Sequence, residues 1–332
     1  LLEEAAGVPP HSPAFLTLAF HRVRLLVEAE KKDEARALLE TLLSSDTPIL
    51  PPSSRNVLLA QRMQLARDLN DFLIYAPRAL IGVTVDLPEY REMPVVLNED
   101  EALRDSTSPR RLFDSDATSV LNGLPLDMLK RAAMSEVLPP ALRREVTLTT
   151  WVRAALLENE EVGKALVPVL SRLIPELTAD LRAYRQAKTW DARQFAAILL
   201  ILRRPGARPF LTDGLGRRTP MNKVDGYRDN WWSCPSFSVR TDTVTFLDDT
   251  NKALARQEVG QIPPVDTAFR AVLAWAGKHP TDPRIPEALS RAVKSARYGC
   301  TSGRLSRQAF RLLHQGYPKS PWTKKTKYWY AG

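Results

Sequence analysis

Cysteines, long apolar runs and low-complexity tracts are scarce or absent in this sequence. With two cysteines in 332 residues, cysteines alone cannot build a zinc site, which needs about four ligands. The longest apolar run, Phe195 to Leu202, is far shorter than the roughly 20 residues that cross a bilayer. Because 44% of the residues are apolar and no biased tract interrupts them, the chain is predicted to fold.

The length allows two or three ordinary domains, or one continuous solenoid. We expect a helical-repeat region over 1–203, an irregular insertion rich in Gly, Pro and aromatic residues over 204–260, and a basic helical unit over 261–332. The chain starts with leucine and shows no signal peptide, which predicts a mature product or a fragment and says little about secretion.

Acidic residues are missing from the last 45 positions. That stretch holds ten basic residues, and so it accounts for the whole net charge of +9. Its candidate binding residues are Arg304, Arg307, Arg311, Lys319, Lys324, Lys325 and Lys327. One interpretation is an ordinary solvated face. The other is a surface for a polyanion: anionic lipid headgroups, an acidic partner or, last because no nucleic-acid motif accompanies it, nucleic acid.

The C-terminal end of the sequence contains two copies of one two-helix repeat. An apolar helix containing Phe269 leads to His-Pro-Thr-Asp-Pro, and one containing Phe310 leads to Tyr-Pro-Lys-Ser-Pro. Asp282 and Ser320 are expected helix caps, because each precedes a proline that suits the first helical turn. A two-helix repeat near 38 to 41 residues is typical of tetratricopeptide-like solenoids.

The run Tyr317-Pro318-Lys319-Ser320-Pro321-Trp322, with Tyr328 and Trp329 after it, resembles the inter-repeat joint of bacterial cell-envelope tetratricopeptide proteins. Examples of such proteins are those of the outer-membrane-assembly lipoprotein type and of the Tol–Pal coordinator type. The resemblance covers about 65 residues at the C-terminal end. It implies an all-α, tetratricopeptide-like solenoid that binds other envelope proteins in the periplasm or at the outer membrane.

Elsewhere, proline positions and apolar periodicity predict the boundaries of the helices. Ser53 or Ser54 is expected to cap a helix that continues to about Tyr75. Prolines 168 and 175 are expected to interrupt a helical stretch over 161–187. The other expected elements are helices at 14–30, 33–43, 125–137, 140–158 and 191–203, a strand or strap at 81–87, and a surface loop at 105–116. The apolar run at 195–202 should make the last of these helices buried on all sides. Near the C-terminus, one apolar helix face is expected from the spacing of Ile285, Ala288, Leu289, Ala292 and Val293.

The 204–260 insertion is too long for an ordinary connection between two helices. It contains Tyr227, Trp231 and Trp232, and this aromatic content argues against disorder. We expect a folded strap that covers an end or the concave face of the helices. The alternative is a loop in which these three aromatic residues contact a ligand or a partner.

A hydrolase that uses the 213–234 loop is a further alternative. Asp213, Asp225 and Asp229 would supply a carboxylate pair. Alternatively, Cys234 would be a nucleophile with His279 or His314 as its base, although both histidines lie at helix ends of the repeat. Aspartates in Gly-rich turns usually serve the turn itself, and no phosphate-loop spacing occurs. We therefore expect a protein that is not an enzyme and has no cofactor or metal.

The two cysteines and the terminal tryptophans carry the remaining expectations. Cys234 and Cys300 are either separate thiols or, as the envelope resemblance favours, a disulfide that closes about 66 residues and contributes on the order of 4 kcal/mol. Trp322 and Trp329 are expected on one face of a last helix, packed near Phe310. The rival interpretation makes them an exposed patch among lysines, at a membrane interface or a binding site.

Overall fold

The computed structural model describes residues 8–9, 11–44, 50–79, 111–204, 206–214, 244–262, 266–297 and 303–331, and the backbone alone of 83–86 and 92–95. Within these residues regular structure is almost entirely helical, which confirms the all-α class. The helices are α2 (Phe15–Glu28), α3 (Lys32–Leu43), α4 (Pro52–Gln64), α5 (Leu69–Tyr75), α6 (Ser115–Asn122), α7 (Leu126–Met134), α8 (Pro140–Leu156), α9 (Glu160–Leu173), the 3₁₀ helix η2 (Pro175–Leu177), α10 (Thr178–Gln186), α11 (Trp190–Arg203), α12 (Asp249–Gln261), α13 (Asp266–Lys278), α14 (Ile285–Ser295), α15 (Gly303–Gly316) and α16 (Pro321–Lys325).

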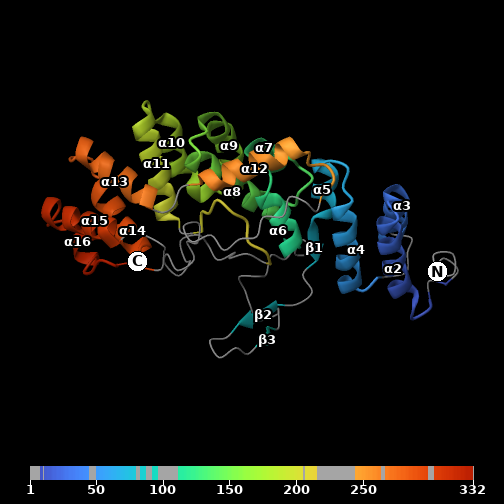
Figure 1. Cartoon of the computed structure of the whole chain (residues 1–332). Coiled ribbons are helices and arrows are strands. Elements are labelled where there is room, and N and C mark those ends of the chain that lie inside the picture. The colour runs from blue at the N-terminus through green and yellow to red at the C-terminus, as the bar shows by residue number, and fades with distance from the viewer. Residues whose placement is uncertain are drawn as a thin grey trace.

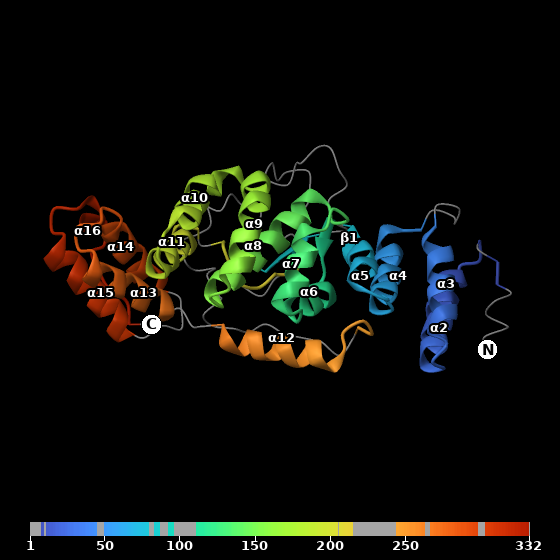
Figure 2. The ribbon, with the colours of Figure 1, turned by 90° about the horizontal axis from the view of Figure 1, so that it is seen from above.

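The molecule is elongated, and its helices follow one another roughly in chain order from one end to the other (Figure 1). The helices α2 and α3 lie at the N-terminal end, and α15 and α16 lie at the opposite end (Figure 2). Most helices pack on their neighbours in sequence: α3 lies between α2 and α4, and α8 between α7 and α9. Contacts among α13, α14, α15 and α16 continue the row to its C-terminal end.

The expected helix from Ser53 or Ser54 to Tyr75 is two helices. Pro52 begins α4, so neither serine is its cap, and the chain leaves the helix at Leu65. Asp68 then adopts an extended conformation, and its carboxylate accepts a 2.8 Å hydrogen bond from the Asp71 amide to start α5. The capping aspartate inside the apolar pattern therefore divides the helix.

Two clusters of buried apolar residues form the core. The smaller one joins α2, α3 and α4 through residues such as Val23, Leu39 and Leu58. The larger one extends from Met63 to Leu313. Tyr75 packs against both clusters, so the first helices are joined to the rest of the molecule by continuous apolar packing.

Among the residues described between α5 and α6 there are four short strands. Strands β1 (Pro77–Ala79) and β4 (Arg111–Phe113) pair antiparallel, with Arg78 opposite Leu112, and β2 (Val83–Asp86) pairs with β3 (Glu92–Val95). β2 confirms the strand expected at 81–87. The loop expected at 105–116 instead ends in β4 and in Asp114, which caps α6 by accepting a 2.8 Å bond from the Ala117 amide.

The middle helices follow the periodicity of the sequence. Helix α11 is buried from Phe195 to Leu202, as its apolar run predicts. Pro175 separates α9 from α10 as expected, but α9 continues through Pro168 without a break. Pro168 is on the exposed side of α9, where water can bond the carbonyl that proline leaves free, while the opposite side buries Leu166 and Leu170.

In the 204–260 region, residues 206–214 form a strap on α6 and α8. Arg153 of α8 is fully buried and donates hydrogen bonds of 3.0 and 3.1 Å to the Pro209 carbonyl. It also bonds the Asn122 and Leu124 carbonyls, at 3.2 and 3.3 Å. The Asn122 amide makes two bonds to the backbone of Leu211, at 2.8 and 2.9 Å. These bonds satisfy a backbone that would otherwise be buried without partners.

The 204–260 region is not irregular throughout, because its last part forms helix α12. Asp248 caps this helix by accepting a 2.7 Å bond from the Asn251 amide. Figure 2 shows α12 alongside the row of helices. Glu258 accepts a 2.7 Å bond from the Leu126 amide at the start of α7, where the helix dipole favours a negative charge. Apart from Ala255, α12 buries little, so the bond between Glu258 and Leu126 contributes to positioning it against α7.

The two joints near the C-terminus share their local geometry. Two backbone hydrogen bonds of 3.0–3.1 Å recur at corresponding positions: Asp282 N to His279 O and Ile285 N to Asp282 O, then Ser320 N to Tyr317 O and Thr323 N to Ser320 O. The Tyr317 hydroxyl also donates a 2.8 Å bond to the Pro280 carbonyl. The two sequence motifs therefore have the same backbone hydrogen-bonding pattern. The bond from Tyr317 to Pro280 links the second joint to the first.

Ser320 caps α16, as predicted, by accepting a 3.2 Å bond from the Trp322 amide. Asp282 is not the cap of α14, which begins at Ile285 with Arg284 before it. The Asp282 carboxylate instead accepts bonds from the Arg284 backbone and guanidinium and, at 2.9 Å, from the Trp275 indole. This aspartate therefore ties the end of α13 to the joint.

Candidate functional site

The apolar faces of α14 and α15 determine where the basic residues lie. Ile285, Ala288, Leu289, Ala292 and Val293 of α14 are fully buried, which confirms the apolar face expected from their spacing. The polar side of each helix is consequently outward. All seven predicted binding residues are exposed, and we call them the C-terminal basic surface: Arg304, Arg307, Arg311, Lys319, Lys324, Lys325 and Lys327.

The residues of the C-terminal basic surface have no carboxylate partners among the described residues. Arg304, Arg307 and Arg311 recur on one face of α15, and the lysines lie in the joint, on α16 and in the tail after it. The nearest acidic residue in the sequence is Glu287, and it is already shared by Arg203 and Arg291. The positive charge of this end is thus not neutralised within the described chain.

Cations of this end lie over aromatic rings. The guanidinium of Arg307 is 5.6 Å from the centre of the Trp329 ring, and that of Arg297 is 6.0 Å from the centre of the Tyr330 ring. Arg291 and the Lys325 ammonium each lie 5.2 Å from the Trp322 ring. Such contacts contribute about 0.5–1 kcal/mol each at exposed positions and hold the rings and cations together.

The expected packing of Trp329 in the core is wrong. Helix α16 ends at Lys325, so Trp322 and Trp329 do not share a helix face. Trp329 is 39% exposed and Tyr328 is 70% exposed, whereas Trp322 is half-buried. The rival interpretation, exposed aromatic residues interleaved with basic residues, therefore describes Trp329.

Small polar residues, and not Trp329, anchor the C-terminal tail that follows α16. The Thr323 hydroxyl donates a 2.6 Å bond to the Tyr317 carbonyl, and the carbonyl of Thr326 is 2.8 Å from Nε2 of His314. A Cβ on Gly303 would collide with the backbone of Ala331, so glycine lets the tail lie against α15. Sequence reasoning missed these contacts, because threonines in a polar tail give no periodic signal.

Lys294 is a further cation that the sequence did not single out. It lies on α14, is half-buried, and has no ion pair or hydrogen bond among the described residues. Burial, together with the positive charges of Arg291 and Lys325, lowers the pKa of Lys294. The three cations therefore form a cluster of like charge, and two of them, Arg291 and Lys325, lie over the Trp322 ring.

Most of the other predicted site residues lie outside the described residues. These are Cys234 and Cys300, the three aromatic residues Tyr227, Trp231 and Trp232, and Asp225 and Asp229. Asp213 is described, and it is exposed in a turn whose next residue, Gly214, bonds the Phe113 carbonyl at 2.9 Å. The proposed disulfide and the loop contacts stay predictions.

The two histidines considered as bases for a hydrolase make structural contacts. The His279 ring lies 3.9 Å from the Trp275 ring, between centres. The His314 ring lies 4.1 Å from that of Phe310. Across the described part of the chain, no three side chains of the metal-binding types gather, and no helix has the length and apolarity to cross a bilayer.

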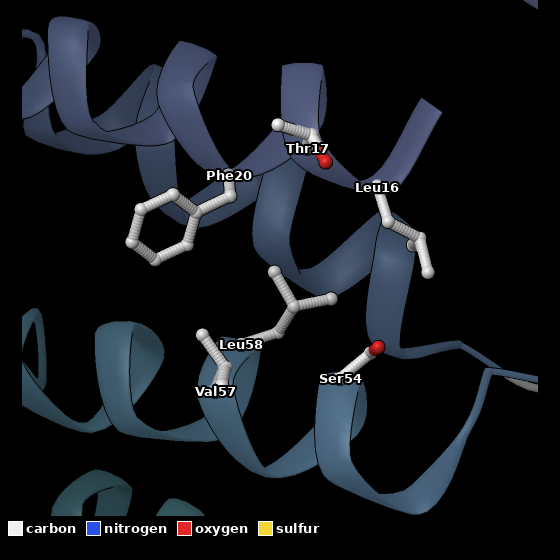
Figure 3. A pocket seen from close by; sticks show the side chains of 6 residues that line it. All are labelled: Leu16, Thr17, Phe20, Ser54, Val57 and Leu58. Carbon is white, nitrogen blue, oxygen red and sulfur yellow. The ribbon is translucent and has the colours of Figure 1, made fainter. Parts of the chain in front are cut away.

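An apolar recess of about 320 Å³ lies between α2 and α4 at the other end of the molecule. Figure 3 shows Leu16 and Phe20 of α2 facing Val57 and Leu58 of α4, with the hydroxyls of Thr17 and Ser54 at its edge. Its lining has no acid, base or thiol. The recess is thus suited to apolar side chains.

Comparisons with family models, with curated proteins and with solved structures find no match to this chain. The assignment of function consequently rests on the chain's own residues and their geometry. The feature that stands out is the C-terminal basic surface, with the exposed Tyr328 and Trp329 beside it.

Proposed function

We propose that this protein is a non-enzymatic, tetratricopeptide-like scaffold of the bacterial cell envelope that docks onto anionic phospholipid through its C-terminal basic surface. The observation that carries the docking is the set of seven exposed cations without a carboxylate partner among the described residues. The repeat architecture is supported by the hydrogen bonds common to the joints at Asp282 and Ser320. Packing of most helices on their sequence neighbours, as in a solenoid, supports it too.

A lipid surface suits this end better than an acidic protein does, because exposed rings accompany the charges. Tyr328 and Trp329 present apolar rings with polar edges, the type of side chain that collects at the headgroup level of membranes. Each Lys or Arg close to an anionic leaflet contributes about 1 kcal/mol. Together, two exposed rings and several cations provide two kinds of attraction, and stable peripheral binding usually needs two.

Vesicle flotation tests the docking. The protein should float with phosphatidylglycerol vesicles and not with phosphatidylcholine vesicles. Added salt should weaken the association, because exposed charges are screened beyond about 10 Å at 0.1 M ionic strength and about 3 Å at 1 M. A triple variant, Lys319→Glu, Lys324→Glu and Lys327→Glu, should lose most of the binding.

A control variant with the same charge change is available on the middle of the molecule. Arg182, Arg185 and Lys188 lie on or just after α10, are exposed and have no ion pair among the described residues. Changing these three to Glu should leave vesicle binding within about twofold of the wild type. Equal loss in both triple variants would mean that net charge alone drives binding, and no binding by the wild type would leave an acidic protein as the partner.

Binding of other envelope proteins is the second part of the proposed function. The observation that favours it is the apolar recess between α2 and α4, beside which Val57 is 47% exposed. A photoreactive amino acid in place of Val57 should cross-link a partner in cells. The same substitution at Leu254, which is 41% exposed on α12, is the control. Cross-linked products identical at both positions would argue against a partner at the recess.

A further inference from the structure

Two cations from two helices lie over the ring of Trp322 at the C-terminal end, and a third cation, Lys294, is close enough to interact with both charges. Arg291 and Lys294 lie three residues apart on α14, Lys325 lies on α16, and α14 packs against α16. The Arg291 guanidinium and the Lys325 ammonium are each 5.2 Å from the centre of the Trp322 ring. The half-buried Trp322 therefore contacts two of the cations, and Lys294 lies one helical turn after Arg291 on α14.

The described residues supply too few carboxylates to neutralise these three cations. Glu287 accepts a 2.8 Å bond from Nε of Arg291, and it also accepts bonds of 3.0 and 2.5 Å from Arg203. Burial alone would raise the pKa of Glu287, but the bonds from Arg203 and Arg291 lower it. One carboxylate thus serves two arginines, and nothing described neutralises Lys294 or Lys325.

The donors of the cluster are also free. The terminal nitrogens of Arg291 make no hydrogen bond among the described residues, and neither do the ammonium groups of Lys294 and Lys325. A half-buried ammonium beside two like charges is unfavourable unless an anion joins it. The arrangement is that of an anion site, with one fork-shaped donor and two point charges.

We propose that Arg291, Lys294 and Lys325 form a binding site for a phosphoryl group, with Trp322 as its wall. A phosphate monoester has a charge of about −1.5 to −2 and three acceptor oxygens, which match three separate cations. A single carboxylate has one charge and two oxygens, and it would leave part of the cluster uncompensated. Arginine suits phosphate because two of its N–H groups can bond two oxygens together.

This proposal extends the docking function. It rests on that function only in assuming that lipid headgroups supply the phosphoryl group. Free phosphate would present the same chemistry to the three cations. We therefore test the site with inorganic phosphate first, and then with vesicles of phosphatidic acid, which displays a phosphomonoester.

The test measures phosphate binding by ³¹P NMR titration at constant ionic strength. The variants Lys294→Gln and Lys325→Gln each remove one charge of the site, and each should weaken binding about tenfold, the loss of one charge-assisted hydrogen bond. Lys188→Gln makes the same charge change on an exposed lysine after α10, outside both the site and the C-terminal basic surface, and should leave affinity within about twofold. All three lysines lack ion pairs in the described chain, so the variants should fold, which circular dichroism checks.

Two results would overturn the site: a wild type that does not bind phosphate, or equal weakening in the Lys294 and Lys188 variants. The vesicle arm separates the two sources of phosphate. Inorganic phosphate that displaces the protein from phosphatidic acid vesicles identifies the lipid headgroup as the ligand. Phosphate binding without any vesicle binding keeps the site, assigns it to free phosphate, and contradicts the docking function alone.

Discussion

Ser290 and Thr326 share a buried hydrogen bond of 2.6 Å between their hydroxyls, although 36 residues separate them in the sequence. The Thr326 hydroxyl also lies 2.9 Å from the Trp322 carbonyl, to which it donates. Ser290 is fully buried and Thr326 is 3% exposed. This pair fastens the end of α16 to α14, and so it positions the residues around Trp322.

Replacing Thr326 with Val should therefore destabilise the C-terminal end. Valine has the same shape but no hydroxyl, so Ser290 loses its partner inside the protein, at a cost of about 1–3 kcal/mol. Differential scanning calorimetry should show a lowered melting temperature. Thr281→Val is the matched control, because Thr281 is exposed and bonds nothing described. A Thr326 variant as stable as this control would contradict the role of the pair.

Replacing Trp329 with Ala should separate stability from binding. Since Trp329 is 39% exposed, its loss should change the free energy of unfolding by no more than about 0.5 kcal/mol. Binding to phosphatidylglycerol vesicles should weaken, because the ring and its contact with Arg307 are lost. A fall of several degrees in melting temperature with unchanged flotation would instead place the ring in the core.

Protonation of Asp282 should lower the free energy of unfolding of the protein in acid. Burial would raise its pKa, but hydrogen bonds from Arg284 and Trp275 lower it from 3.8 to about 2. A carboxyl with a lowered folded pKa stabilises fully above its unfolded pKa and loses this contribution as pH falls through the folded value. The window is therefore about pH 4 to 2, and the contribution is on the order of 1–2 kcal/mol, since the partner Arg284 is partly exposed.

Thermal unfolding of the wild type and Asp282→Asn from pH 6 to pH 2 measures this contribution. The two proteins should differ most above pH 4, and the difference should shrink toward pH 2 as Asp282 is protonated. A difference that stays constant over the whole range would show that charge at this position does not contribute.

The amine of Lys294 should titrate below the ordinary lysine pKa of about 10.4. The direction follows from its burial and from the charges of Arg291 and Lys325. Competitive acetylation across pH 7 to 11, read by mass spectrometry of the peptide, gives the midpoint for this residue. The variant Lys325→Gln should raise the midpoint, and inorganic phosphate should raise it in the wild type. A midpoint unmoved by either change would mean that the neighbouring charges are screened.

The disulfide between Cys234 and Cys300 stays a prediction from the sequence. Peptide mapping of the native protein without reductant should recover the two cysteines as one linked pair. Reduction should then lower the melting temperature, since closing a loop of about 66 residues contributes on the order of 4 kcal/mol. Recovery of both cysteines as free thiols would contradict the bond and weaken the case for an oxidising compartment.

Local pattern was sufficient for most of the helices, though not for the division of α4 from α5 or for α12, and it identified the buried side of several. The spacing of Ile285, Leu289 and Val293 predicted the buried face of α14, and the continuous apolar run predicted that α11 is buried on all sides. Ser320 caps α16 as its sequence context indicates. These features depend on neighbours within one or two helical turns, and so they can be read from the sequence alone.

The tail and the phosphoryl site depend on contacts between distant residues. The sequence predicts Trp329 in the core, because a short last helix among positive charges needs packing to stay folded. In the structure, buried threonines hold the tail instead, and this ring is exposed. Lys294 was one basic residue among ten in the sequence. Packing of α14 on α16 brings it beside Arg291 and Lys325. The sequence by itself determined the helices, their apolar faces and the excess of positive charge. Which cations meet, and which rings stay exposed, was decided by tertiary packing, because hydrogen bonds and Coulomb interactions depend on distance in space.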